Sequence, residues 1–447
     1  MPDRSPGTPR SCVATLPGLT RRRVRISEAV LVLLLLSASA LALRRPLVEQ
    51  EFSVDESYRL TASRYFWTTF IDRDLFGPAW QPNYLILTHP PGAQYLIGFG
   101  LWLQGWTPDQ LNSPYDSRRS RAFNEAAGNV PPPALLAAAR RVEFVVALGA
   151  LLMLYLIGRT LLNRLAGVLA VVLALGNPLL STHWTRALAE APLAFWSLLA
   201  LFLALRSVAR LATDKVSIRS CMAAGAALGL AIATKLSGVL GCLGLAYFFV
   251  LQQSLVVWRS DPLLKLRHWL VLGLAVACTF VAVNPLLYPN PVGNTALLFD
   301  FRSIEMQEQR RIWPDDAVPD SLPVRLELVA KSVFRDYGTV SGASPPLELL
   351  LFAGGLGVAL LTVVRHLKAG QPFGPSALFL CWVLATYVAS VVYLGFDSPH
   401  YYIPLVQLNV VLEAVALSWA AGWLSDRARL GRPGRFFRSV AGPERAQ

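Results

Sequence analysis

Charged residues are scarce in this chain. Only 15% of its 447 residues are Asp, Glu, Lys or Arg, against about 25% in soluble proteins. In contrast, 54% are hydrophobic and the mean hydropathy is +0.45. Apolar runs near or above the ~20 residues that cross a bilayer recur along most of the chain. The composition excludes a large soluble domain and predicts an integral membrane protein.

Cysteine is also scarce, and its placement indicates no site. Cys12 lies in a polar amino-terminal tail, and no C-x-x-C pair occurs. The others stand singly in apolar segments: Cys221, Cys242, Cys278 and Cys381. This pattern argues against a disulfide framework and against a zinc site.

The net charge of +13 raises the question of a nucleic-acid partner. The basic residues lie in short loops between apolar runs rather than in one patch, which is typical of membrane topology. We therefore expect the membrane, and no nucleic acid, as the partner of these charges.

Ten apolar runs are candidate membrane spans. They cover residues 26–43, 142–158, 165–180, 192–205, 221–234, 238–257, 268–287, 347–364, 376–394 and 402–424. The first run resembles a secretory signal, but many spans follow it, so we expect an uncleaved anchor. The predicted organisation is a disordered tail over residues 1–25, a membrane domain over 26–424 and a basic tail over 425–447.

An eleventh apolar run, residues 92–106, decides the orientation. At ~1.5 Å per residue it would form about 22 Å of helix, too short for a core of about 30 Å. If it lies along the surface, one set of short loops carries most of the Lys and Arg, and the opposite set carries only Arg186 and Lys235. The positive-inside rule favours this arrangement. It predicts a multi-pass protein of the plasma (inner) membrane, with both termini cytoplasmic and two large outer loops, residues 44–141 and 288–346.

Charged side chains recur at the outer ends of the predicted spans. They are Asp55, Glu56, His89, Arg140, Arg141, Arg186, Glu190, Lys235 and His400. Each has a structural explanation when taken alone, such as helix capping, an i, i+4 pair or contact with lipid headgroups. Together, several cations with nearby carboxylates are typical of a site for an anionic lipid headgroup. Aromatic residues around the acids, Tyr58 among them, suit headgroup depth, although they could simply anchor the loop.

Such a site suits glycosyl transfer from a polyprenyl-phosphate sugar. A carboxylate such as Asp55 would accept the proton of the attacking hydroxyl. Adjacent carboxylates raise each other's proton affinity, and fixed cations stabilise the departing phosphate. A single displacement would invert the anomeric centre.

Five segments carry a family resemblance. In chain order they are "VDESY", "THPPGAQYLIG", "RRVEFVVALGALLMLYLIGR", "RALAEAPLAF" and "GLAIATKLSG". Their order and spacing resemble GT-C glycosyltransferases of the protein O-mannosyltransferase and lipid A aminoarabinose transferase group. The resemblance covers residues 26–240 and, more loosely, "HYYIP" near the last span. It implies an all-α polytopic fold with about 10–11 transmembrane helices, interfacial helices in the first outer loop, and a polyprenyl-phosphate sugar as donor.

The resemblance also implies roles for individual residues. Asp55 and Glu56 match the acidic pair and would be catalytic. The donor phosphate would be held by His89, Arg140 or Arg141, Arg186, Lys235 and His400. Glu190, Tyr58 and Tyr401 would position the substrate. Two of these positions depart from the family pattern, because Glu190 replaces Asp and His400 replaces Arg.

Other features of the sequence bear on a metal, on the acceptor and on alternative functions. "DRD" at residues 72–74 matches the D-x-D of metal-dependent glycosyltransferases, but the family usually works without metal, so we expect neither a metal nor another cofactor. The acceptor could be a lipid, a protein or a polysaccharide, and residues 288–346 could form a lid over it. A transporter or flippase of a lipid-linked substrate is the main alternative, and a noncatalytic scaffold is a third. Abundant Arg and Ala favour a bacterial cell-envelope enzyme.

Overall fold

The computed structural model describes residues 17–211, 218–256, 262–339, 344–371 and 373–428. These residues form helices and short 3-10 or π turns, and their only β pairing is an isolated bridge between Ala317 and Phe396. The tails predicted over residues 1–25 and 425–447 lie mostly outside this described part. The expected all-α class is confirmed.

Each of the ten predicted spans falls on a helix. The helices are α1 (Pro17–Glu49), α6 (Pro133–Leu161), α7 (Arg164–Gly176), α9 (Glu190–Leu211), α10 (Ile218–Thr234), α11 (Leu240–Val256), α12 (Pro262–Ala282), α15 (Pro345–Lys368), α16 (Pro375–Tyr393) and α17 (Ile403–Ala428). Among the described residues, α1, α6, α9, α15, α16 and α17 contain stretches long and apolar enough to cross a membrane, and the other four contain shorter apolar stretches. The chain is therefore a polytopic membrane protein.

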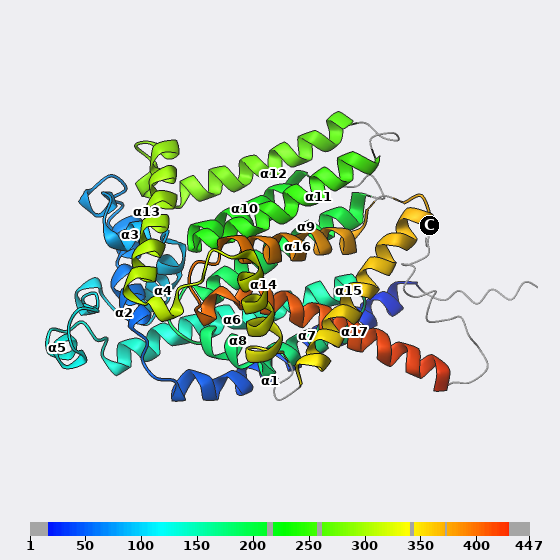
Figure 1. Cartoon of the computed structure of the whole chain (residues 1–447), viewed down its shortest axis with the longest axis horizontal. Coiled ribbons are helices and arrows are strands. Elements are labelled where there is room, and N and C mark those ends of the chain that lie inside the picture. Colours follow the sequence, from blue (N-terminus) through cyan, green and yellow to red (C-terminus); the bar gives the residue numbers. More distant parts are fainter. Residues whose placement is uncertain (1–16, 212–217, 257–261, 340–343, 372, 429–447) are drawn as a thin grey trace, which may run out of the picture.

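Seven further helices come between these ten in the described part of the chain. They are α2 (Val54–Ala62), α3 (Tyr84–Thr88), α4 (Gly92–Leu103), α5 (Arg121–Ala126), α8 (Pro178–His183), α13 (Pro291–Ile312) and α14 (Leu322–Lys331). Figure 1 shows α2, α3, α5 and α13 gathered at one end of the long bundle, at the left of the view. The first residues of α1 and the last residues of α17 lie at the opposite end.

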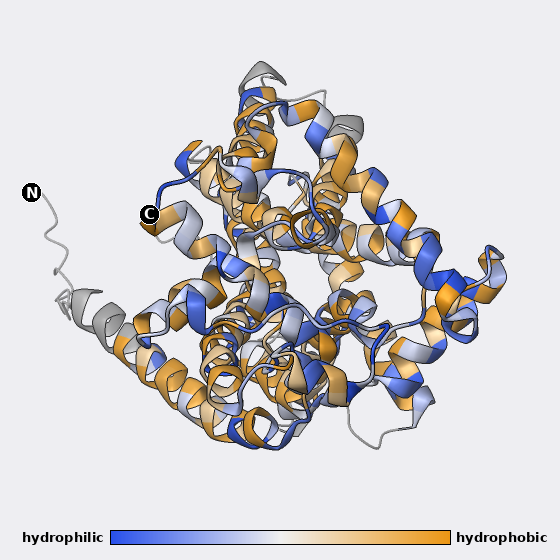
Figure 2. Cartoon of the chain, turned by 90° about the vertical axis from the view of Figure 1, so that its left-hand side faces the viewer, coloured by the Kyte–Doolittle hydropathy of each residue, from blue (hydrophilic) through white to orange (hydrophobic). Residues whose placement is uncertain are grey.

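Helix α4 occupies the eleventh apolar run. Its 12 residues reach only about 18 Å at ~1.5 Å per residue, which is too short to cross a bilayer. Ile97 and Leu101 on this helix are fully buried, in a hydrophobic cluster that also contains Leu60 of α2 and Ile86 of α3. The cluster also contains residues of α6, α10 and α12, so it packs α2, α3 and α4 onto the end of the bundle. Viewed from that end, hydrophobic residues predominate on the helices at the lower left, and polar segments run through the middle and the right (Figure 2).

Helices α15 and α17 approach closely at one glycine. A Cβ atom added at Gly355 would lie 2.0 Å from the carbonyl oxygen of Leu412, whereas one added at Gly357 would meet nothing within 4 Å. Small residues allow this kind of close backbone approach between membrane helices.

We expect Gly355→Ala to destabilise the protein by about 1–3 kcal/mol, because the added methyl group must push α15 away from α17. The measurement is the midpoint of thermal unfolding in detergent, followed by tryptophan fluorescence. Gly357→Ala on the same helix is the matched control and should be neutral or slightly stabilising. Equal midpoints for both variants would contradict the packing described for Gly355.

Candidate active site

A cavity of about 500 Å³ opens at the end of the bundle where α2, α3, α5 and α13 gather. Its charged and histidine side chains come from several separate segments: Asp55 and Arg59 of α2, His89, Arg119, Glu190 of α9, Lys235, Arg302 and Glu305 of α13, and His400. Aromatic residues complete the wall, including Tyr58, Tyr84, Trp313 and Tyr401. The structure thus brings together seven of the residues singled out from the sequence: Asp55, Tyr58, His89, Glu190, Lys235, His400 and Tyr401.

Asp55 lies in the first turn of α2 and points into this cavity. Asp55 is exposed toward the cavity, and the protein around the cavity still partly desolvates its carboxylate. This desolvation raises the pKa of Asp55 above its ordinary value, and Glu190 raises it further, whereas the nearby Arg59, Lys235 and Arg186 lower it. A carboxylate with a raised pKa is a better proton acceptor.

Glu56 has a different environment from its neighbour. Its side chain is fully buried, and its carboxylate accepts two hydrogen bonds from Arg140, both at 2.7 Å. It also accepts from the backbone N–H groups of Ser53 and Ala187, both at 3.0 Å. These four bonds occupy Glu56 completely, and it does not line the cavity.

Arg140 is equally occupied. Besides its pair with Glu56, it donates to the backbone carbonyls of Gln50 and Glu51, at 2.9 and 3.0 Å. The ion pair therefore joins α2, α6, residues 50–51 and the segment before α9. Arg141 is exposed on α6 and donates to Gln104 at 3.1 Å. Neither arginine of the predicted pair lines the cavity, so a phosphate held there would need other cations.

Arg186 lies close to the cavity without being part of its lining. The side chain is half-buried, and its Nε has no hydrogen-bond partner among the described residues. Its charge lowers the pKa of Asp55, so its role is electrostatic in this arrangement.

Lys235 and Glu190 form a half-buried ion pair on the cavity wall, with Nζ and Oε1 2.8 Å apart. Lys235 also lies over the ring of Tyr401, 5.8 Å from its centroid. The Tyr401 hydroxyl in turn accepts a hydrogen bond of 2.5 Å from Arg302. Arg302 is ion-paired with Glu305 one turn later on α13. These contacts tie α9, α13 and the segment before α17 around the cavity.

Arg59 was not singled out from the sequence. It is 6% exposed, lines the cavity and has no ion-pair partner among the described residues within 4 Å. Its Nη1 donates to the amide oxygen of Gln94 at 3.1 Å, in the orientation of Gln94 that satisfies both groups. Arg59 follows Asp55 by four residues on one helix, and this spacing places both on the same face. This i, i+4 spacing is visible in the sequence and is the signal that could have identified Arg59 as a cavity residue.

The two histidines of the cavity are not cations at neutral pH. Burial lowers the pKa of His89 well below its ordinary value, and the charges of Arg59 and Lys235 lower it further. Burial and the charge of Lys235 lower the pKa of His400 to about 3. Both rings therefore act as neutral hydrogen-bonding groups here.

The D-x-D segment has a local structural role. Asp74 accepts hydrogen bonds from the backbone N–H groups of Phe76 and Gly77, at 3.3 and 2.7 Å. Asp72 is exposed. In the part of the chain that the structure describes, no three His, Cys, Asp or Glu side chains group in a way that could hold a metal ion.

Comparisons with known proteins identify a similar family and similar folds. The model of the dolichyl-phosphate-mannose-protein mannosyltransferase family matches residues 80–290, slightly less than half of the chain. Comparison with curated protein sequences finds no match. Among solved structures, the archaeal oligosaccharyltransferase AglB from Archaeoglobus fulgidus is similar, with 17% identity, a TM-score of 0.54 and coverage of 91% of this chain and 52% of that one.

ArnT from Cupriavidus metallidurans is also similar, with 17% identity, a TM-score of 0.55 and coverage of 89% of this chain and 63% of that one. The chain thus spans about half to two thirds of the length of these proteins. The likeness confirms the GT-C fold and the expected resemblance to the O-mannosyltransferase and ArnT group. The structural likeness shows the fold, and the match to the family model shows that residues 80–290 are similar to a mannosyltransferase family.

We expect Glu56→Gln to destabilise the protein by about 3–5 kcal/mol, because it leaves the charge of Arg140 buried without its counter-ion. The measurement is again the thermal unfolding midpoint. Glu125→Gln is the control, since the pair of Glu125 with Arg121 is exposed and worth about 0–1 kcal/mol. A stable Glu56→Gln protein would contradict the structural role of the buried pair.

Proposed function

We propose that this chain is an inverting membrane glycosyltransferase that uses a polyprenyl-phosphate sugar as donor, with Asp55 as the general base. The observation that carries the proposal is the shared cavity of Asp55 and Arg59. It places a carboxylate of raised pKa on the same helix face as a buried arginine that has no acid within 4 Å among the described residues. A base and a cation able to bind phosphate are the two groups that this reaction needs.

The reaction would proceed in one displacement. The acceptor hydroxyl attacks the anomeric carbon and its proton passes to Asp55. The bond between the anomeric carbon and the phosphate oxygen breaks, and the polyprenyl phosphate leaves with its negative charge. Arg59 and Lys235, which both line the cavity, stabilise that charge in a site that needs no reorganisation. His89 and His400 would donate or accept hydrogen bonds as neutral rings.

The solved relatives support a lipid-phosphate ligand. The similar ArnT structure contains undecaprenyl phosphate, and the AglB structure contains a dolichol phosphate with an inhibitory peptide. We propose the same class of carrier for this chain, and an acceptor that is a lipid, protein or polysaccharide of the cell envelope. The distribution of Lys and Arg supports an orientation with the cavity outside and both termini in the cytoplasm. The abundance of Arg and Ala supports a bacterial origin, and we propose the plasma (inner) membrane as the location.

We expect Asp55→Asn to lower sugar transfer by at least about 100-fold, because the amide cannot accept the proton. The measurement is transfer of label from a panel of radiolabelled polyprenyl-phosphate sugars to a membrane extract. Binding of undecaprenyl phosphate should persist in this variant. Asp72→Asn is the matched control and should retain activity, which also tests the D-x-D segment. Full transfer by Asp55→Asn would exclude Asp55 as the base. An absence of transfer by the unmodified chain would instead favour a transporter or scaffold.

We expect the acid limb of the kcat/KM profile to lie at higher pH than an ordinary aspartate of pKa about 4 would give. Only ionised Asp55 accepts a proton, so activity is lost as the pH falls through its pKa, which burial raises. Arg59 lowers this pKa, so Arg59→Gln should move the limb to still higher pH.

The same Arg59→Gln variant should bind undecaprenyl phosphate about tenfold more weakly, because a charge-assisted hydrogen bond is lost. Arg64→Gln is the control, since Arg64 is exposed and donates to the backbone of Thr61 at 3.0 Å. An acid limb that stays in place in Arg59→Gln would contradict the electrostatic coupling to Asp55.

A further inference from the structure

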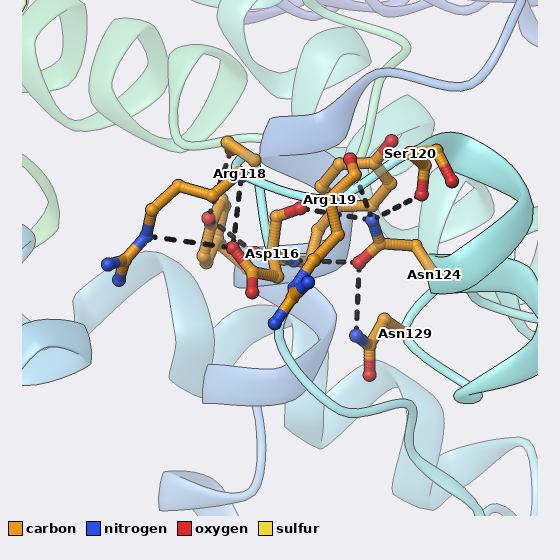
Figure 3. Close-up of polar contacts among 9 residues, drawn as sticks. Asp116, Arg118, Arg119, Ser120, Asn124 and Asn129 are labelled. Atoms are coloured by element: carbon orange, nitrogen blue, oxygen red, sulfur yellow. Dashed lines mark hydrogen bonds and ion pairs between the residues drawn. The ribbon is translucent and has the colours of Figure 1, made fainter.

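The loop over residues 112–129 is a built part of the cavity rim. Its centre is the amide of Asn124, which is fully buried. The amide oxygen accepts from the backbone N–H of Asp116 at 2.7 Å and from Asn129 at 3.0 Å. The amide nitrogen donates to the carbonyls of Asp116 and Ser120, both at 3.0 Å. Figure 3 shows these bonds converging on Asn124, so the loop has one defined shape.

The same loop is fixed to the helix that carries Asp55. Ser57 of α2 donates to the carbonyl of Asn129 at 2.7 Å and accepts from Asn112 at 2.8 Å. Tyr58 of α2 donates to the carbonyl of Tyr115 at 2.5 Å. The loop therefore keeps a constant position relative to Asp55, which lies one turn before Tyr58 on the same face.

Three arginines of this loop have different environments. Arg118 faces Asp116, with 3.8 Å between Nε and Oδ1, and Arg121 pairs with Glu125 at 2.9 Å. Arg119 has no acid within 4 Å in the described part of the chain, and it lines the cavity. Its guanidinium lies over the ring of Phe123, 5.4 Å from the centroid. In Figure 3, Arg118 and Arg119 extend in different directions.

Arg119 is separate from the inner charges of the cavity. After burial, the strongest influences on the pKa of Asp55 are Arg59, Glu190, Lys235 and Arg186, and Arg119 is not among them. The proposed donor carries a single negative charge on its phosphodiester, which Arg59 can pair with, because Lys235 is already paired with Glu190. The rim arginine is therefore left for a second anion.

We propose that Arg119 binds a phosphate or carboxylate group of an anionic acceptor, and so directs the acceptor hydroxyl toward Asp55. This inference rests on the proposed transferase function, because it assigns the acceptor class of the same cavity. A guanidinium forms charge-assisted, often bidentate hydrogen bonds with either anion. Ser117, which also lines the cavity, offers a hydroxyl beside it for the sugar or headgroup of the acceptor.

The test uses the full chain in nanodiscs of phosphatidylcholine, saturated with undecaprenyl phosphate so that the inner cations are occupied. The probes are glucose 6-phosphate, glucuronic acid and, as the neutral reference, glucose, with binding measured by ligand-observed NMR. We expect both anionic sugars to bind at least about tenfold more tightly than glucose. Arg119→Gln should abolish this preference, whereas Arg118→Gln, the matched neighbour, should retain it. Unchanged thermal midpoints confirm that both variants fold.

Two results would overturn the inference. One is equal binding of charged and neutral sugars by the unmodified chain. The other is an equal loss in Arg118→Gln and Arg119→Gln, which would indicate general attraction of anions to a basic surface. A failure of the transferase proposal is read separately, as an absence of undecaprenyl phosphate binding. In that case the same titrations without the lipid still report whether Arg119 selects anions.

Discussion

The buried ion pair between Glu56 and Arg140 is the constraint on which the site depends. It fastens the first turn of α2 to α6, to residues 50–51 and to the backbone before α9. The three guanidinium nitrogens of Arg140 and both carboxylate oxygens of Glu56 have hydrogen-bond partners. A buried ion pair is tolerated only when its polar atoms are satisfied in this way. Asp55, one residue before Glu56, is thereby held at the cavity. The adjacent acids divide two tasks: one fixes the helix and the other faces the substrate.

The charges of the cavity follow from this division. Lys235 is balanced by Glu190, and Arg302 by Glu305, while burial keeps His89 and His400 neutral. The cations without an acid within 4 Å in the described part of the chain are Arg59 within the cavity and Arg119 at its rim, and ionised Asp55 offsets one of these two charges. A polar site with so little unbalanced charge can hold an anionic lipid headgroup and still release the product. The ion pairs supply oriented polar groups, but they add no net positive charge that would hold the anionic product.

The sequence predicted the fold well because membrane spans depend on composition over long windows. All ten apolar runs fall on helices, and the short run at residues 92–106 forms a helix of only 12 residues. The convergence of Asp55, His89, Glu190, Lys235 and His400 on one cavity also agrees with their placement near span ends. Apolar composition thus predicted the spans, and charge near the span ends predicted the cavity.

What the sequence could not supply was the direction of each side chain. Arg140 and Arg141 are neighbours, yet one is buried against Glu56 and the other is exposed beside Gln104, because successive helix positions point about 100° apart. Arg302 and Glu305 reach the cavity only because α13 folds back over α3, and no local pattern encodes that contact. The orientation of the side chains thus decides which cations meet the substrate, and α2 shows that the decision is made by packing: its buried face carries Glu56, and its cavity face carries Asp55 and Arg59.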